Sequence, residues 1–551
     1  MKTRLISPTQ EAYAYPLLIK NILETPLIYS PDQEIVYRDQ TRYTYKTFGQ
    51  RVKQLAAMLT RLGVKPGDTV AVMDWDSNRY LECFFAVPMM GAVLHTINIR
   101  LTPEQLIYTI NHAEDDVILV NEDFVSLLAG VKDRFETVKN VILLSDTGKR
   151  PDTDLDVAGE YEALMADTPA AYDFPDFDEN TMATTFYTTG TTGLPKGVFF
   201  SHRQIVLHTY GLMSGLCAYQ AQARVDSGDV YMPMTPMFHV HAWGIPYLMT
   251  MLGSKQVYPG RYEPEVLLKL ILTEKVTFSH CVPTIINMLV TSPVIDQVDL
   301  SAWKVIIGGS ALPQGLCKAS LKHGINLYSA YGMSETCPLL TVANIKPHLM
   351  DKSQDEQVEI RCKTGLPVPN VNLEIVNMNG DPLPHDGTSA GEVVVRSPWL
   401  TQGYIKDDEK SRELWANGWL HTGDIGVIDD EGYLKITDRL KDVIKTGGEW
   451  ISSLELEDII SQHEAVSEVA VVGVADEKWG ERPLAMIVLR DGFQGKVTDK
   501  DIQNFCMTFV DKGQLPKYGV PTRIVLDTDI PKTSVGKISK KDIRAAYDSD
   551  Q

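Results

Sequence analysis

The chain has 551 residues, of which 44% are hydrophobic and 23% are charged, as in an ordinary globular protein. At about 150 residues per domain, this length allows roughly three or four folding units, or two of very unequal size. The 52 Lys and Arg residues against 72 Asp and Glu residues give a formal net charge of −20. So acidic a surface repels nucleic-acid phosphates, and we expect no nucleic-acid partner.

The N-terminus carries two cations but no apolar stretch behind them, so it does not resemble a signal peptide. The longest apolar stretch, near residues 84–93, contains Pro88 and Gly91 and is far shorter than the about 20 residues of a membrane-spanning helix. We therefore expect a cytoplasmic protein with no integral membrane segment.

The seven cysteines form no C-x-x-C pair and are predicted to be core residues in a reducing compartment, without a metal or redox role: Cys83, Cys217, Cys281, Cys317, Cys337, Cys362 and Cys506.

Helix and strand signals alternate along most of the chain. Residues 45–62 have helical periodicity and lead, through a Gly-containing turn, to an apolar strand at 69–73. The same order recurs for helices at 103–112 and 264–274 and strands at 116–120 and 276–280. This alternation predicts α/β layers with largely parallel sheets.

The pattern changes towards the C-terminus. Residues 391–396 and 432–436 are typical of antiparallel strands, which we expect in a small barrel-like subdomain. We predict a mixed α/β and α+β protein with a large domain at 1–437, a hinge at 438–442 and a small mobile α+β domain at 443–551. The last domain is expected to contain helices at 453–462 and 499–510 and strands at 466–474, 484–489 and 523–526.

The most distinctive local motif is the segment Tyr187–Gly197, which is rich in Thr and Gly and contains Lys196. The backbone N–H groups of such a loop can approach phosphate oxygens closely, and the lysine adds a positive charge. It is not a Walker A loop, because no Gly-Lys pair is followed by Ser or Thr. A simple surface turn is the alternative, but both flanking segments have the apolar character of buried strands.

Two further motifs contain single carboxylates. In Tyr331–Thr336, Glu335 lies beside two hydroxyl residues, a combination that suits a partly hydrated Mg²⁺; the alternative is a glutamate at the start of a helix. Asp424 follows Thr422 and Gly423 and could accept hydrogen bonds from two ribose hydroxyls; the alternative is an ordinary aspartate in a turn.

Two more segments lie near and beyond the expected boundary. The charged residues Asp438–Asp442 precede a pair of glycines, Gly447 and Gly448, which favours a hinge over an ordinary solvated charge cluster. Near the C-terminus, the turn-rich segment Pro531–Lys537 presents Lys537, for which a solvent-exposed lysine is the default interpretation.

Together and in this order, the five segments resemble the adenylate-forming superfamily, which includes acyl-CoA synthetases, aryl-CoA ligases, firefly luciferase and the adenylation domains of peptide synthetases. The resemblance extends over about residues 30–545. The segments 236–244 and 445–452 are most similar to bacterial medium- and long-chain fatty-acid–CoA ligases. Ser334 stands where the family usually has threonine, and the hydroxyl is retained.

The resemblance implies a reaction of a fatty acid with ATP and Mg²⁺ to acyl-AMP and pyrophosphate, followed by transfer of the acyl group to CoA. Lys537, Glu335 and His239 are the implied catalytic residues, Thr188 and Glu335 the implied metal ligands, and Lys441 the implied hinge. Gly447 and Gly448 are assigned to CoA. The implied nucleotide-binding residues are Thr188, Thr189, Gly190, Thr191, Thr192, Gly193, Lys196, Gly309, Ser310, Ala311, Ser329, Ala330, Tyr331, Gly332, Ser334, Asp424, Ile436, Arg439, Lys441, Lys445, Trp450 and Lys537.

His239, Val240, Trp243 and Tyr247 resemble the wall and gate of a fatty-acyl tunnel, although Trp243 could be a core aromatic residue instead. The segment 232–247 contains no charged residue apart from its histidines, which favours an apolar acyl chain over an amino acid. An aryl- or short-acyl–CoA ligase, an enzyme that loads acyl groups onto a carrier protein, and a non-catalytic nucleotide sensor stay open as alternatives. Glu335 and Lys537 argue against the sensor. A homodimer is also compatible with the resemblance.

Overall fold

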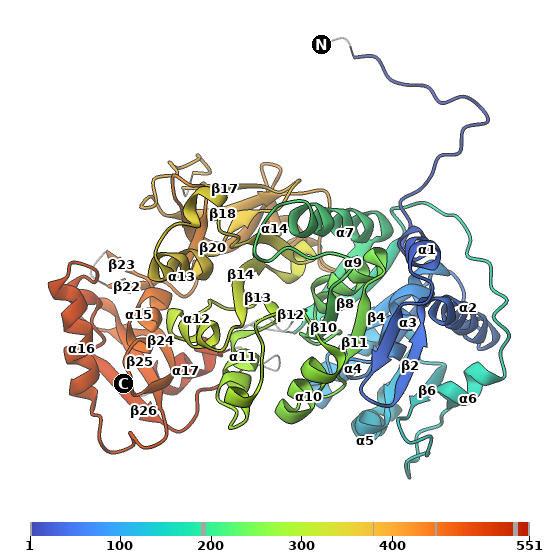
Figure 1. Cartoon of the computed structure of the whole chain (residues 1–551), viewed down its shortest axis with the longest axis horizontal. Helices are drawn as coiled ribbons and strands as arrows, with labels where there is room; N and C mark the ends of the chain where they lie inside the picture. Colours follow the sequence, from blue (N-terminus) through green and yellow to red (C-terminus); the bar gives the residue numbers. More distant parts are fainter. Residues whose placement is uncertain (1–2, 189–193, 378, 447–448, 533–537, 549–551) are drawn as a thin grey trace.

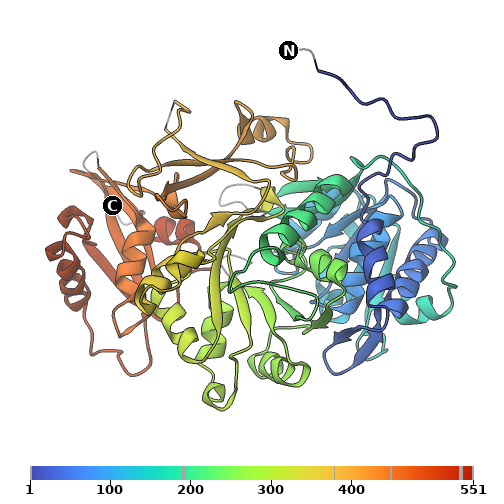
Figure 2. The same cartoon turned by 45° about the horizontal axis from the view of Figure 1, so that its top comes forward.

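The computed structural model describes residues 3–188, 194–377, 379–446, 449–532 and 538–548 (Figure 1). In these residues, four sheets and their helices form a large layered body and a smaller C-terminal unit at one end (Figures 1 and 2). The predicted fold class is confirmed: parallel and mixed sheets, a curled antiparallel sheet and a small C-terminal α+β unit. The described part has no helix long and apolar enough to span a membrane.

The first sheet has seven strands in the order β7-β6-β5-β3-β4-β8-β9, and all its pairs are parallel except β8–β9. Its central strands are apolar and buried along their length, as expected when helices cover both faces of a parallel sheet. The bounds are β3 Thr69–Met73, β4 Val93–Thr96, β5 Asp115–Asn121, β6 Asn140–Leu144, β7 Gly159–Glu160, β8 Met182–Thr188 and β9 Lys196–Ser201.

The second sheet has nine strands in the order β16-β15-β14-β13-β12-β10-β11-β1-β2, with a parallel centre and antiparallel pairs at its ends. The carboxyl ends of β10, β12 and β13 therefore meet at one edge, where open α/β sheets bind ligands. The bounds are β1 Glu34–Tyr37, β2 Thr41–Thr44, β10 Val230–Met234, β11 Lys255–Tyr258, β12 Phe278–Cys281, β13 Lys304–Ile307, β14 Asn326–Gly332, β15 Leu339–Val342 and β16 Leu366–Pro367.

The third sheet is antiparallel and curled, with the order β17-β18-β20-β19 and β21 paired to β20. The strand predicted at 391–396 is confirmed as β18. For the strand predicted at 432–436, the predicted first residue is wrong. Gly432 has a φ of 81° and closes a turn onto Asp429, so the strand begins only at Leu434. The bounds are β17 Asn372–Val376, β18 Gly391–Arg396, β19 Trp415–Ala416, β20 Trp419–Ile428 and β21 Leu434–Arg439.

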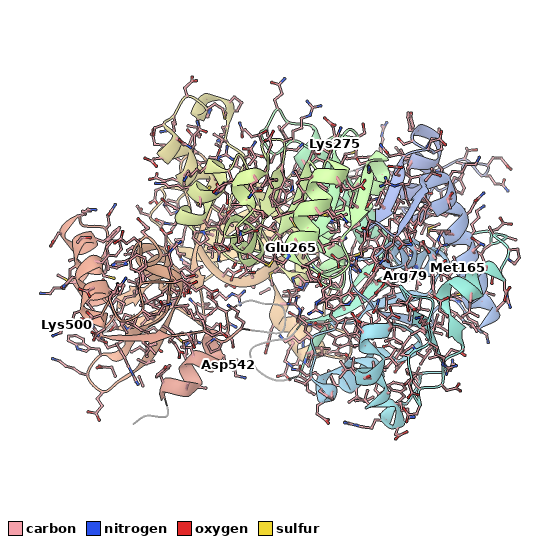
Figure 3. All side chains as sticks on the ribbon, turned by 60° about the horizontal axis from the view of Figure 1, so that its bottom comes forward. Arg79, Met165, Glu265, Lys275, Lys500 and Asp542 are labelled. Carbon is pink, nitrogen blue, oxygen red and sulfur yellow. The ribbon has the colours of Figure 1, made fainter. Side chains whose placement is uncertain are left out.

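Residues 443–548, which we call the C-terminal unit, form a sheet in the order β23-β22-β25-β24, with β26 parallel to β25. Helices α15, α16 and α17 pack on this sheet over apolar clusters that are separate from those of the large body. The two strands predicted at 466–474 and 484–489 are longer than expected, because their ladder continues to the pair Asp476–Gly480. The bounds are β22 Ile444–Thr446, β23 Glu449–Ile451, β24 Val466–Asp476, β25 Gly480–Leu489, β26 Arg523–Asp527, α15 Ser453–Ser461, α16 Asp499–Asp511 and α17 Lys540–Asp548. Figure 3 shows Lys500 on α16 and Asp542 on α17 at the surface of this unit.

The helices of the large body include those predicted at 45–62, 103–112 and 264–274. Local signals explain their starts, since the Thr44 side chain caps α2, and Thr102 with Gln105 forms a capping box at α4. The strand predicted at 276–280 begins two residues late, because Val276 still bonds back to α10. The bounds are α1 Lys20–Tyr29, α2 Tyr45–Arg61, α3 Asn78–Met89, α4 Pro103–Ala113, α5 Val125–Ala129, α6 Tyr161–Ala166, α7 His202–Cys217, α8 Val240–Trp243, α9 Ile245–Leu252, α10 Pro264–Glu274, α11 Pro283–Val290, α12 Gln314–Lys322, α13 Gln354–Cys362 and α14 Asp408–Leu414.

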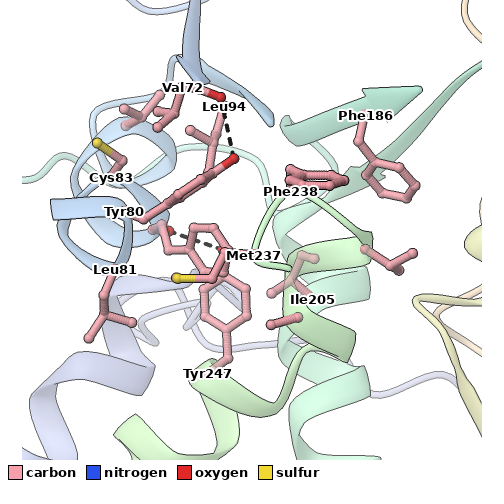
Figure 4. Packing of buried hydrophobic residues seen from close by; sticks show 14 of the residues in the cluster. Val72, Tyr80, Leu81, Cys83, Leu94, Phe186, Ile205, Met237, Phe238 and Tyr247 are labelled. Atoms are coloured by element: carbon pink, nitrogen blue, oxygen red, sulfur yellow. Dashed lines mark hydrogen bonds between the residues drawn. The ribbon is translucent and has the colours of Figure 1, made fainter. Parts of the chain in front are cut away.

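The main core lies where α3, α7 and α9 pack against the first sheet (Figure 4). Tyr80 donates a hydrogen bond to the Val72 carbonyl, and Tyr247 donates one to the Phe84 carbonyl, so two buried phenols are satisfied by backbone oxygens. This packing fixes the loops that follow β3 and β10, which contribute to the sites described next.

Candidate active site

The Thr/Gly motif connects two paired strands. Thr188 ends β8 and lies opposite Lys196, the first residue of β9, in an antiparallel ladder. The intervening residues of the motif that were predicted to bind phosphate, Thr189 to Gly193, lie outside the described residues. The ladder therefore fixes both ends of this loop, and Lys196 is half-buried at its exit.

Tyr404 links Lys196 with Glu335. Glu335 is 8% exposed in a short 3-10 helix, Ser334–Thr336, that follows β14. The Tyr404 hydroxyl donates a hydrogen bond of 2.7 Å to Glu335 Oε1, and Lys196 Nζ lies 4.6 Å above the centre of the Tyr404 ring. Burial and the Glu335 charge raise the pKa of Tyr404, so it stays a hydrogen-bond donor. Tyr404 was not among the predicted site residues, because the sequence contains no signal for it beyond an aromatic residue after Gly403.

The described residues fit a magnesium ion that arrives with a phosphate ligand, rather than a metal held by protein alone. They contain no cluster of three or more His, Cys, Asp or Glu side chains able to hold a metal. Glu335 Oε1 accepts the hydrogen bond from Tyr404, and Thr188 ends β8, where its ladder partner Lys196 lies over the ring of the same tyrosine. Mg²⁺ commonly uses one or two carboxylates together with phosphates and water, which this donor set can supply.

A second polar group joins three residues from three strands. Asp424 of β20 lies opposite Arg439 of β21, with 3.4 Å between Arg439 Nε and Asp424 Oδ1. The Tyr331 hydroxyl donates a hydrogen bond of 2.6 Å to Asp424 Oδ2. Burial and the Asp424 charge raise the pKa of Tyr331 well above its ordinary value. The structure thus brings together three residues that the sequence had assigned to the nucleotide.

Other predicted nucleotide residues of the large body lie on β14, on β21 and in the loop after β13. Gly309, Ser310 and Ala311 form the loop after β13, and the last two of these residues are exposed. Ser329, Ala330 and Gly332 belong to the adjacent β14, so the ends of two parallel neighbours converge here. Ile436 lies in β21, and its N–H donates to Thr364 Oγ1 at 2.8 Å.

The predicted acyl-pocket residues lie in a tightly packed part of the large body. Val240, Trp243 and Tyr247 are buried, and His239 is half-buried. The Trp243 ring lies 4.9 Å from the His280 ring, and it packs so closely on Gly308 that a Cβ there would approach the indole within 2.9 Å. Burial lowers the pKa of His280 to about 3, which keeps this wall uncharged.

The segment 240–243 has an uncommon backbone. Val240, His241, Ala242 and Trp243 have φ angles of 49°, 56°, 47° and 59°, and Gly244 continues the turn at 70°. These four residues therefore form one turn of left-handed helix, a conformation that costs about 1–2 kcal/mol per non-glycine residue. Strain of this kind is concentrated at functional sites.

A cavity of about 270 Å³ lies near this segment, at the ends of β3, β4, β10 and β11. Asp76 is buried in its wall, where it accepts hydrogen bonds from the Tyr262 hydroxyl and the Met237 N–H. Burial raises the pKa of Asp76 to about 8. The sequence could not predict this cavity, because its lining comes from four distant segments.

The hinge and the C-terminal motif are described only in part. Lys441 is exposed after β21, and Lys445 is exposed on β22. Lys537, Gly447 and Gly448, and the side chain of Trp450, lie outside the described residues. Nearby Lys540 is not solvated as a surface lysine would be, since Nζ lies 2.8 Å from Glu457 Oε1 and 2.6 Å from Ser453 Oγ.

Comparisons with known proteins cover nearly the whole chain. The family model described as AMP-binding enzyme matches residues 28–405, and the model of its C-terminal domain matches residues 455–537. A long-chain-fatty-acid–CoA ligase of Thermus thermophilus is 39% identical over 524 residues, which are 94% of this chain and 93% of the relative. A 3-methylmercaptopropionyl-CoA ligase of Ruegeria lacuscaerulensis is 37% identical over 97% of both chains.

Solved structures show the same fold. The ATP-bound MatB of Rhodopseudomonas palustris has a TM-score of 0.82 at 24% identity and covers 97% of this chain and 99% of its own. A fatty acyl CoA synthetase of Mycobacterium tuberculosis has a TM-score of 0.69 at 26% identity, with 97% and 99% coverage. With the two family models and relatives well above 30% identity over almost full length, the chain belongs to the AMP-binding enzyme family, the adenylate-forming superfamily that its motifs resemble.

Proposed function

We propose that the protein is an AMP-forming acid–CoA ligase that favours fatty acids of medium to long chain length. The observation that carries the proposal is that β14 and the short helix after it hold both polar groups, Tyr331 with Asp424 and Glu335 with Tyr404, in a chain 39% identical to a named long-chain ligase. Other relatives are named for 3-methylmercaptopropionate and 4-hydroxybutyrate, so the names of the relatives do not determine the preferred chain length.

In the first half-reaction, a carboxylate oxygen attacks the α-phosphorus of ATP while the bond to the β-phosphate oxygen breaks and pyrophosphate leaves. Two anions must meet, so the site has to neutralise charge that grows in the transition state. Lys196 and the Thr/Gly loop bind the β- and γ-phosphates. Glu335 with Thr188 would hold Mg²⁺, which would supply positive charge to these phosphates when bound. Lys537 acts on the α-phosphate, and Asp424 with Arg439 holds the ribose.

In the second half-reaction, the CoA sulfur attacks the acyl carbon and AMP leaves. We infer that the C-terminal unit turns about Lys441 between the two steps, withdrawing Lys537 and presenting the segment with Gly447 and Gly448 to the CoA thiol. The adenine lies between the loop 309–311 and Ser329–Tyr331.

The proposed acyl site supports an apolar substrate. Val240, Trp243 and Tyr247 are buried, and neighbouring His280 is kept neutral by burial. Each buried methylene contributes about 0.8 kcal/mol, so catalytic efficiency is expected to rise severalfold per methylene until the pocket is filled. An amino acid would instead need a buried counter-charge for its ammonium group.

The deciding experiment is pyrophosphate release measured with acids from acetate to palmitate, and with benzoate, in the presence and absence of CoA. We expect a rise through the medium-chain acids and thioester formation with CoA. Benzoate as the best substrate would support an aryl-CoA ligase instead, and acyl-AMP that accumulates despite CoA would indicate a carrier-loading enzyme.

The role of Lys537 has its own test. Lys537→Ala is expected to slow adenylation by about 10²- to 10³-fold with little change in the KM for ATP, because the lysine acts on charge that develops in the transition state. Supplied acyl-adenylate should still form thioester at a near-normal rate. The matched control is exposed Lys541→Ala. Lys540 would be unsuitable as a control because of its ion pair with Glu457.

A further inference from the structure

Asp76 lies where three loops meet. It follows β3 of the first sheet and directly precedes Ser77, the N-cap residue of α3. Its carbonyl accepts a hydrogen bond of 2.9 Å from the Gly260 N–H after β11. Its carboxyl group, in a residue that is 3% exposed, accepts one of 2.8 Å from the Met237 N–H after β10 and another from the Tyr262 hydroxyl. One residue of the first sheet thus joins two loops of the second sheet.

The first sheet also holds the next residue of the loop after β10. The Thr96 hydroxyl, at the end of β4, donates a hydrogen bond of 3.0 Å to the Phe238 carbonyl. Met237 and Phe238 are buried, and both belong to the main apolar cluster (Figure 4). The chain therefore enters the left-handed turn 240–243 from a position that the first sheet fixes.

The exit from this turn is held by the helix that Asp76 leads into. Tyr247 of α9 donates its hydrogen bond of 3.0 Å to the Phe84 carbonyl of α3, and the two rings stack with their centres 5.5 Å apart. Helix α3 and the residues that lead into it therefore fix the segment 237–247 at both of its ends.

The turn needs this support because of its backbone. All four of its residues have positive φ, and none of them is glycine. A strained backbone of this kind persists only where the surrounding structure over-determines it. The side chains of Val240 and Trp243, which we assign to the acyl wall, project from this turn. Loss of the hydrogen bond at Met237 would free the entry to the turn and leave these side chains without one fixed position.

Asp74 provides a contrast at the same end of β3. It is 1% exposed, and its carboxyl group accepts hydrogen bonds of 2.6 Å from the Ser77 hydroxyl and 2.7 Å from the Asn121 amide. Ser77 caps α3 and Asn121 ends β5, so both donors belong to the layer of the first sheet. Removal of the Asp74 side chain therefore disturbs an equally buried carboxyl group while the hydrogen bond at Met237 is retained.

We propose that Asp76 is a positioning residue for the selection of the acyl chain. Together with Tyr262, it holds Met237 at the entry to the turn 240–243, and the turn holds the side chains against which the acyl chain packs. Asp76 acts through this segment and not on the reacting atoms. That the segment binds an acyl chain rests on the proposed function, whereas the hydrogen bonds to Asp76 do not.

Hydrogen–deuterium exchange of the full chain tests these hydrogen bonds without relying on activity. Asp76→Ala removes both bonds to the carboxyl group, so peptides from 236–247 should exchange about tenfold faster, while the peptide of α4, Pro103–Ala113, should change little. Asp76→Asn should exchange like wild type, because its amide can accept from the Met237 N–H and donate to the Tyr262 oxygen. Unchanged exchange at 236–247 in Asp76→Ala would overturn the proposal, whatever the enzyme's activity.

The functional test compares kcat/KM for octanoate and for butyrate in pyrophosphate release. In Asp76→Ala the ratio of the two values should fall about tenfold, as expected if roughly two of the additional methylenes of octanoate lose their contacts. The KM for ATP should stay within about twofold of wild type. Asp76→Asn should restore the ratio, and Asp74→Ala should lower thermal stability without changing it.

Tyr262→Phe keeps the test decisive if Asp76→Ala does not fold. It removes one hydrogen bond from a half-buried side chain, so the ratio for the two acids should fall about threefold and exchange at 236–247 should rise in proportion. An equal loss for both acids, or the same change of ratio in Asp74→Ala, would refute a role in selection. Wild type that releases no pyrophosphate with either acid would contradict the proposed function instead, and the exchange measurement would still decide on the hydrogen bonds.

Discussion

Tyr404 connects two charges that are distant in the sequence. Its ring supports Lys196 at the exit of the Thr/Gly loop, and its hydroxyl orients the carboxylate of Glu335. One side chain thus positions both the lysine assigned to phosphate and the carboxylate assigned to Mg²⁺. The two functions of the residue can be separated, because removal of the hydroxyl leaves the ring in place.

Tyr404→Phe should lower the rate of pyrophosphate release by about tenfold, because a buried hydrogen bond to a charged group contributes roughly 1.5–3 kcal/mol. The effect is expected to depend on Mg²⁺ concentration, since the carboxylate would hold the ion less well. Tyr219→Phe, at a tyrosine that is 58% exposed, is the control. An unchanged rate and unchanged Mg²⁺ dependence would show that the hydroxyl has no positioning role.

Asp76 predicts a pH dependence of folding stability. Its pKa is about 8 in the folded protein, whereas the pKa of an unfolded aspartate is about 3.9. Between these pH values the carboxyl is therefore protonated in the folded state and ionised in the unfolded state. The contribution of Asp76 to the free energy of unfolding is fully present below about pH 4. It falls as the pH rises to about 8, by at most about 1.4 kcal/mol per pH unit. Asp76→Asn should remove this loss.

Urea unfolding of both proteins at about pH 6, 7 and 8 measures the effect. Other titrating groups cancel in the difference, so wild type should lose stability relative to Asp76→Asn with each step. A difference that is constant over this range would mean that Asp76 is already ionised in the folded protein.

The left-handed turn at 240–243 determines where the predicted acyl-pocket side chains project. Without it, a chain leaving β10 would place Val240 and Trp243 on other faces of the segment. The sequence could not predict this conformation, because none of its four residues is a glycine or an asparagine, the usual signals for positive φ.

Ala242→Gly tests the strain in this turn. Glycine stabilises the folded state because it relieves the strain of a positive φ, and it stabilises the unfolded chain because it has more conformational freedom. These two effects should nearly cancel, so the free energy of unfolding should change by less than about 0.5 kcal/mol. Ala56→Gly, in the right-handed helix α2, should cost about 1 kcal/mol or more. Equal destabilisation by both substitutions would contradict a strained turn.

Elements with local signals could be predicted, and those fixed by tertiary contacts could not. Helix α4 has a capping box and β3 a continuous apolar run, and both were predicted within a few residues. Residues such as Glu335 and Asp424 lie in motifs, so the sequence could name them. The position of Tyr404 between Lys196 and Glu335 depends on how separate elements pack, and no local pattern indicates such packing.

At the scale of the whole molecule, α15 of the C-terminal unit meets the end of β21, where the Ser453 N–H donates a hydrogen bond of 2.6 Å to Asp438 Oδ2. The predicted boundary, residues 438–442, spans the end of β21 and the turn before β22. Rotation of the unit would break the contact between Ser453 and Asp438 while leaving both sheets intact. The sequence predicted the two units from their patterns, but not the surfaces on which they meet.

Lys441→Pro tests the proposed rotation. Proline fixes φ near −65°, so a hinge that must change its backbone angles should be blocked. Adenylation is expected to survive better than thioester formation, because only the second step requires the turn. Rapid-quench measurement of both half-reactions gives the comparison. Equal loss of the two would indicate general disruption rather than a blocked hinge.

The register of β20 with β21 couples the nucleotide to this hinge. Arg439 lies opposite Asp424 at the end of the ladder, and Lys441 follows two residues later on the same segment. A ligand that holds Asp424 and Arg439 therefore biases the angle from which the C-terminal unit departs. By thermodynamic reciprocity, a substitution at Lys441 that shifts the population of angles must also change nucleotide affinity, by at most the factor by which the nucleotide shifts that population.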